Sequence, residues 1–118
     1  MDLKRQILQA CWQGLVRLFI LQEARKGPIY GVRLKKLLAR QGYAISSGSL
    51  YPMLHQLEEG GALRSRIRIF RGRARKYYDL TPLGLKLLMD IKAALPPCLS
   101  GLPEETVPAP DAGLVNLD

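Results

Sequence analysis

Apolar residues near the start of the chain recur every three or four positions, which is the period of an α-helix. They form two adjacent stripes, one of Ile7, Cys11, Leu15 and Leu18 and one of Leu8, Trp12, Val16 and Phe19. A helix that covers one side of a small core needs about one such stripe. The pattern therefore predicts a helix from Leu3 to Arg25 whose apolar surface is wide enough to contact another molecule as well.

Two shorter helices are expected next. The first runs from Tyr30 to Gln41, and Gly42 follows it at the C-terminal cap. Ser46 and Ser47 then offer N-caps for a third helix from Gly48 to Glu59.

The spacing changes to the period of a β-strand at residue 63. From Leu63 to Ile69 arginines alternate with mostly aliphatic residues, so one face is basic and the other is expected to be buried. Residues 71–73 are expected at the tip of a hairpin and residues 76–80 in its returning strand. Thr81 is the expected N-cap of a last helix that runs to Leu95 and again has a wide apolar face.

This order of elements predicts a mainly α fold with a small β-hairpin. It is that of a winged helix-turn-helix: three helices, a wing hairpin and a C-terminal dimerisation helix. In helix-turn-helix proteins one helix crosses the DNA backbone while the next enters the major groove. The third helix is therefore the expected reader of the DNA sequence.

The net charge of +8 is unevenly distributed. Residues 1–95 hold all 18 basic residues and six acidic ones, so they carry +12, whereas residues 96–118 carry −4. That last segment is rich in proline and has no aromatic residue, so we expect one domain over residues 1–95 and a flexible acidic tail over residues 96–118. A domain so basic attracts polyanions, and nucleic acid is the first candidate.

The outward face of the third helix combines hydroxyl groups with longer polar side chains. Hydroxyls suit phosphates, and Gln or His can reach base edges. The predicted DNA-binding residues of this helix are Ser47, Ser49, Tyr51, Pro52, His55 and Gln56. The alternatives are that Ser46 and Ser47 only cap the helix and that Tyr51 only packs in the core. His55 shows no carboxylate partner at a useful spacing, which favours a groove-facing or solvent-exposed histidine over a pH switch or a metal ligand.

The hairpin holds seven basic residues and no acidic one between residues 64 and 76. A solvated surface normally mixes charges of both signs, whereas charge of one sign suits a phosphate backbone or a narrow minor groove. The predicted DNA-binding residues of the wing are Arg66, Arg68, Arg71, Arg73, Arg75 and Lys76. A merely solvated face is the alternative.

Several other classes of function find no support in the sequence. Cys11 and Cys98 lack metal-site spacing and make no disulfide framework, and no arrangement of catalytic residues can be identified. We therefore expect no enzyme, no metal and no cofactor. The longest apolar stretch, Gly14 to Leu21, is too short to span a membrane and no signal peptide is evident, so a cytoplasmic protein is expected.

Four motifs, in this order, resemble the PadR family of winged-helix transcriptional regulators, in its short type with one C-terminal helix. They are residues 27–31 (GPIYG), 47–54 (SGSLYPML), 57–61 (LEEGG) and 75–84 (RKYYDLTPLG). The resemblance implies a homodimer that binds an inverted-repeat operator, usually as a repressor. Some family members release DNA when a phenolic acid or drug-like ligand binds, so a small aromatic or drug-like effector is a possible partner here.

The resemblance also implies that the first and last helices hold the dimer together, which fits their wide apolar faces. The predicted interface residues are Leu8, Trp12, Phe19, Leu87, Ile91 and Leu95. Two other readings of the sequence stay open: a winged-helix module that binds protein within a larger assembly, and an architectural protein that binds DNA without sequence preference.

Overall fold

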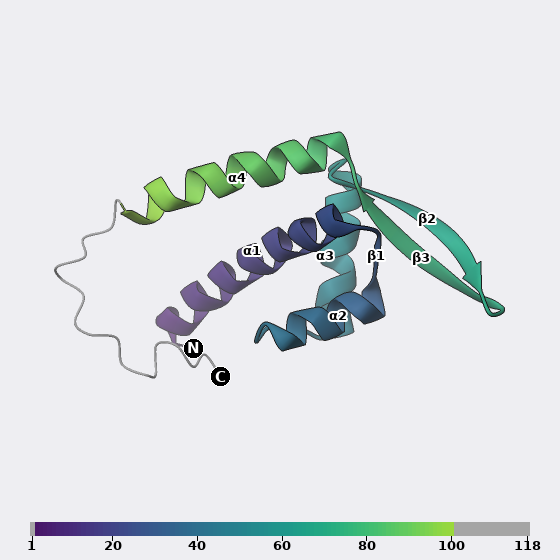
Figure 1. Ribbon diagram of the computed structural model, residues 1–118. Helices are drawn as coiled ribbons and strands as arrows, with labels where there is room; N and C mark the ends of the chain where they lie inside the picture. Colours follow the sequence, from purple (N-terminus) through teal and green to yellow (C-terminus); the bar gives the residue numbers. More distant parts are fainter. Residues whose placement is uncertain (1, 101–118) are drawn as a thin grey trace.

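The structure, a computed structural model, describes residues 2–100 and has the predicted order of helices and hairpin. Its elements are α1 (Leu3–Lys26), β1 (Ile29–Tyr30), α2 (Gly31–Arg40), α3 (Ser47–Glu59), β2 (Leu63–Phe70), β3 (Arg73–Leu80) and α4 (Pro82–Ser100). In Figure 1, α1 and α4 run past each other in opposite directions, and the β2–β3 hairpin extends away from the helices. The winged helix-turn-helix expected from the sequence is confirmed.

The core lies where the first three helices meet the base of the hairpin and the start of α4. Its fully buried side chains come from five elements and are Ile20, Leu34, Leu38, Leu50, Leu54, Leu63 and Leu88. Only the second half of α1 contributes, since its buried residues begin at Val16. The first half of α1 leaves Leu3 and Ile7 exposed, so this part of the helix is not held by the core.

The three strands form an antiparallel sheet in the order β1-β3-β2. Phe70 pairs with Arg73 across a two-residue turn, and both turn residues, Arg71 and Gly72, have positive φ (51° and 77°). Positive φ at both positions defines a type I′ turn, whose twist matches that of the strands it joins. The tip is therefore one residue shorter than expected, and β3 begins at Arg73 instead of residue 76.

One residue joins the hairpin to the last helix. The Thr81 hydroxyl lies 2.5 Å from the Gly61 carbonyl oxygen and 3.1 Å from that of Ala62, and it accepts a hydrogen bond from the Gly84 N–H at 2.9 Å. The Thr81 N–H donates to the Ala62 carbonyl at 3.1 Å. Gly84 sits directly against that carbonyl, where a β-carbon would not fit. These contacts explain why threonine and glycine stand at these two positions.

The expectation that the whole aliphatic face of the hairpin is buried is wrong. Leu63 and Tyr78, at its base, are buried, but Ile67 and Ile69 are 70% and 78% exposed. The reason is length: the outer half of the hairpin reaches beyond the helices, so no element covers either of its faces (Figure 1). The sequence also did not predict the strand β1, because a strand of two residues is too short to show an alternation of apolar and polar positions.

The last helix does not end at Leu95, as was expected from the two prolines that follow. It continues through Pro96 and Pro97 to Ser100. Each proline removes one backbone donor, but its fixed φ of about −65° is itself a helical value, so the two prolines cost hydrogen bonds without excluding a helical backbone. Residues 101–118, most of the expected acidic tail, lie outside the described part of the chain.

Candidate nucleic-acid interface

The amino end of α3 brings hydroxyl groups and a lysine together on the surface. Ser46 is the N-cap, since its Oγ accepts from the Ser49 N–H at 3.3 Å. Ser47 has a different contact: its Oγ accepts from Lys35 Nζ of α2 at 3.2 Å. Ser47 and Ser49 are exposed, and a helix N-terminus with hydroxyls and a nearby ammonium suits a phosphate group. Of the two serines that might only cap, one caps and the other does not.

Tyr51 is not buried in the core, but its side chain does contact another helix. Its ring lies against Gly31 at the start of α2, so closely that a β-carbon on Gly31 would come 2.6 Å from Tyr51 Cε1. The side chain is nevertheless 44% exposed. Two of the motifs quoted above, GPIYG and SGSLYPML, thus meet in one contact. The contact orients the ring while leaving part of it accessible beside the exposed Pro52.

Both side chains predicted to read bases have partners within the protein. His55 Nε2 lies 2.6 Å from Glu59 Oε1, one turn further along α3. The statement that His55 lacks a carboxylate partner at a useful spacing is therefore wrong, because four residues along a helix is such a spacing. Gln56 Oε1 accepts a hydrogen bond from Arg17 Nε of α1 at 3.2 Å.

These residues border an open groove of about 470 Å³ between α1 and α3. Gln13 and Arg17 line it from α1. From α3 the lining residues are Ser49, Pro52, Met53, His55, Gln56 and Glu59. Four of the six residues predicted to bind DNA through this helix therefore share one surface feature.

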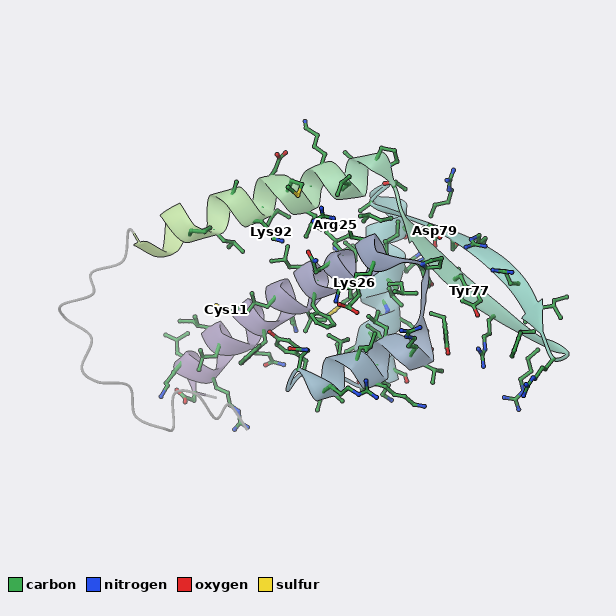
Figure 2. The ribbon with its side chains drawn as sticks, viewed as in Figure 1. Cys11, Arg25, Lys26, Tyr77, Asp79 and Lys92 are labelled. Atoms are coloured by element: carbon green, nitrogen blue, oxygen red, sulfur yellow. The ribbon has the colours of Figure 1, made fainter. Side chains whose placement is uncertain are left out.

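Two of the six predicted wing residues are paired with acids. Arg66 Nε lies 2.7 Å from Asp79 Oδ2, and this hydrogen-bonded ion pair raises the pKa of Arg66 further. Lys76 Nζ lies 3.6 Å from Glu58 Oε1. Figure 2 shows Asp79 and its neighbour Tyr77 on β3. The charge of Arg66 is thus paired within the hairpin, and that of Lys76 is paired with α3.

The other four predicted wing residues have no carboxylate within ion-pair distance in residues 2–100; they are Arg68, Arg71, Arg73 and Arg75. Two of them pack on aromatic rings instead. The Arg75 guanidinium lies 4.7 Å from the Tyr30 ring centre and 5.6 Å from that of Phe70, and Arg71 lies 5.3 Å from the Phe70 ring. Cation–π contacts of this kind orient a guanidinium without neutralising it. The wing therefore keeps most of its positive charge.

Glu58 is a residue whose role the sequence did not reveal. Its carboxylate accepts hydrogen bonds from the Ser65 hydroxyl and from the Ser65 N–H at 3.3 Å, and it also pairs with Lys76. The hydrogen bonds from Ser65, with the Lys76 charge, lower the pKa of Glu58. This carboxylate links the end of α3 to both strands of the wing, and so connects the two elements that are expected to contact DNA.

Comparison with known proteins agrees with this geometry. The model of the transcriptional regulator PadR-like family matches residues 20–90, from the second half of α1 into α4. The chain belongs to this family. Among its relatives is the transcriptional regulator Rv3488 of Mycobacterium tuberculosis, 45% identical over 83 residues that cover 70% of this chain and 78% of that protein.

Solved structures of transcriptional regulators have the same fold. A PadR family transcriptional regulator from Eggerthella lenta superposes with a TM-score of 0.75 at 31% identity, over 81% of this chain and 85% of the other. The protein TA0346 of Thermoplasma acidophilum gives 0.70 at 31% identity, over 77% and 89% of the two chains. Members of the PadR-like family are DNA-binding regulators, not enzymes. In residues 2–100 of this member, no helix is long and apolar enough to cross a membrane.

The six residues predicted to form a PadR-like dimer interface differ in how much of each side chain is exposed to solvent. Trp12 and Phe19 are half-buried within the chain, because both rings pack against Tyr43, with centroid distances of 4.9 and 6.2 Å. Leu8 and Leu95 are half-buried, whereas Leu87 and Ile91 are exposed. Among residues 2–96, the remaining large exposed apolar residues of the two helices are Leu3, Ile7, Leu15, Leu83, Leu85 and Met89.

Proposed function

We propose that this PadR-like regulator is a homodimer that binds an inverted-repeat operator and represses the genes beside it. The third helix would enter the major groove and the wing would contact phosphates or the minor groove. A protein that controls chromosomal DNA in this way would act in the cytoplasm. Release of DNA by a small aromatic or drug-like ligand rests on the family resemblance alone.

The observation that carries this proposal is the uncompensated charge of the wing. Arg68, Arg71, Arg73 and Arg75 lie on an extended hairpin with no carboxylate at ion-pair distance in the described residues. Arg68 and Arg75 even face each other across the two strands. Like charges in that position destabilise a hairpin, so a polyanion is the partner that relieves the repulsion.

The dimer is supported by the apolar surface of α1 and α4. Ile7 and Ile91 are 58% and 38% exposed, and both helices carry further exposed leucines. Exposed apolar side chains gathered on two adjacent helices are typical of a protein–protein interface, and a second copy of the same chain is the commonest partner.

Selection from a random DNA library, followed by binding measurements over a salt series, tests the proposal. We expect enrichment of an inverted repeat and an affinity that falls steeply with salt. Equal affinity for all sequences would indicate an architectural protein instead. Little affinity for any DNA at about 0.15 M salt would contradict DNA binding by this surface.

The last outcome would favour a module that binds another protein. One observation supports that alternative: Ile67 and Ile69 leave an apolar face on the hairpin opposite the arginines. Acidic protein could then take the place of DNA on the basic face.

A further inference from the structure

A hydrogen bond from Arg17 of α1 reaches the Gln56 amide on the outward surface of α3. The Arg17 Nε donates to Gln56 Oε1 at 3.2 Å, although the two residues are 39 positions apart. The guanidinium is itself held in place, because its second nitrogen, NH1, donates to the Gln13 carbonyl at 3.0 Å, one turn earlier in α1. The Gln56 side chain therefore has its oxygen turned toward α1 and its amide NH2 group turned away.

Gln56 lies on the part of α3 that is free to meet a ligand. It is exposed, as are Pro52 and His55, whereas Leu50, Met53 and Leu54 on the opposite side of the helix are buried. Arg17 is half-buried at the edge of the groove between α1 and α3. A base that approached this face of α3 would meet the NH2 group before the oxygen.

The orientation matters because glutamine reads two kinds of base in different ways. Its pair with adenine needs both ends of the amide, since the oxygen accepts from the adenine N6 amino group while the NH2 group donates to N7. Guanine presents two acceptors, O6 and N7, in the major groove, and the NH2 group alone can serve them. A glutamine whose oxygen is turned toward α1, with one lone pair already accepting from Arg17, presents mainly its NH2 group to a base, so it is suited better to guanine than to adenine.

We infer that Arg17, which need not touch DNA, is a positioning residue that sets the base preference of Gln56 in favour of guanine. This inference rests on the proposed function, in which α3 reads the operator. It adds a specificity determinant on α1, a helix otherwise assigned to the dimer.

The test is selection from a random DNA library by the full chain, by four variants at positions 17 and 56, and by one control variant. Gln56→Ala first identifies the base pair that Gln56 reads, as the position whose preference disappears. At that position the unmodified protein should favour guanine over adenine, and Arg17→Met should lower the ratio of guanine to adenine by about tenfold. Arg17→Lys keeps a donor and should retain the preference. In the double variant Arg17→Met with Gln56→Ala, the loss of Arg17 should have no further effect on base preference.

Arg25→Met is the matched control, since it removes the same charge from the last turn of α1 (Figure 2). It should leave the base preference unchanged.

If Arg17→Met weakens binding to all sequences equally and reduces the salt dependence, Arg17 contacts phosphate and the inference is wrong. If the unmodified protein preferred adenine at the base pair that Gln56 reads, the inference would also be wrong. This outcome is measured on the unmodified protein, so it does not depend on whether the Arg17 variants fold. An unaltered motif in Gln56→Ala would refute the inference but not the function, whereas selection of no motif by any form would refute both.

Discussion

At the scale of single residues, the stability of the protein depends on a few close contacts between elements. The clearest is Gly84, whose missing side chain leaves room for the Ala62 carbonyl. Replacement of Gly84 by Ala would place the new β-carbon against that backbone oxygen and 2.6 Å from Leu80 Cδ1. We expect the free energy of unfolding to fall by about 3 kcal/mol, as in overpacked sites, measured by chemical denaturation.

Gly14→Ala is the matched control for this prediction. Gly14 lies within α1, and nothing in the described structure lies within 4 Å of a β-carbon built there. Because alanine favours the helix more than glycine does, this variant should be more stable by about 1 kcal/mol. If both variants behaved alike, the junction at Gly84 would be looser than the structure indicates.

The hydrogen bonds of Glu58 make the attachment of the wing dependent on pH. The pKa of Glu58 is lowered in the folded protein, chiefly by Ser65, so the charged carboxylate stabilises the fold above its ordinary pKa. This contribution is lost as the pH falls through the lowered value. The unfolding free energies of the unmodified protein and Glu58→Gln should therefore differ at pH 7 and converge in acid. In Ser65→Ala, an NMR titration should show the pKa of Glu58 closer to its ordinary value.

At the scale of elements, the hairpin divides into a packed base and an unsupported outer half. Ile69 is exposed, so Ile69→Thr should change the free energy of unfolding by less than about 0.5 kcal/mol. Leu63 is buried at the base, and Leu63→Ala should cost about 2–5 kcal/mol. Thermal or chemical denaturation compares the two. A large loss in Ile69→Thr would mean that another surface covers the outer half in solution.

The wing arginines should likewise contribute unequally to DNA binding. Arg73 has no carboxylate partner in the described residues, whereas Arg66 is paired with Asp79. Each phosphate contact adds about 0.9 to the slope of log affinity against log salt, so Arg73→Ala in both wings of a dimer should lower the slope by about 1.8. Arg66→Ala should lower it less. Arg25→Ala on α1 is the control, and an equal effect of all three variants would show that only the overall charge matters.

Local patterns predicted most of these elements, and their failures have physical causes. The helix caps and the changes in period are local signals, so all four helices and the hairpin could be expected from the sequence. The exposure of Ile67 and Ile69 depends on how far the hairpin extends past the helices, which its alternation does not encode. The contact of Arg17 with Gln56 joins residues 39 positions apart, and that of Glu58 with Ser65 crosses from a helix to a strand. The pair of His55 with Glu59, by contrast, has a helical spacing from which it could have been predicted.

At the scale of the whole molecule, the exposed apolar surface of α1 and α4 predicts the oligomeric state. Ile7→Glu and Ile91→Glu each put a charge on that surface without touching the core, so we expect either to convert the dimer to a folded monomer in sedimentation experiments. Val32→Glu is the control, since Val32 is equally apolar and 57% exposed but lies on α2. A monomer at micromolar concentration before any substitution would rule out the dimer.

Because Thr81 is the only residue between β3 and α4, a change in the orientation of α4 would also change the orientation of the wing. The bonds of Thr81 to Gly61, Ala62 and Gly84 brace this joint, so a rotation of α4 is passed on to β3. The eight residues of β3 span roughly 26 Å at about 3.3 Å each. A tilt of about 10° at the joint would therefore move the tip by about 4–5 Å, most of the roughly 6 Å width of a minor groove. In the proposed dimer, a small change in how the two α4 helices pack would therefore be enough to move each wing tip into or out of its groove.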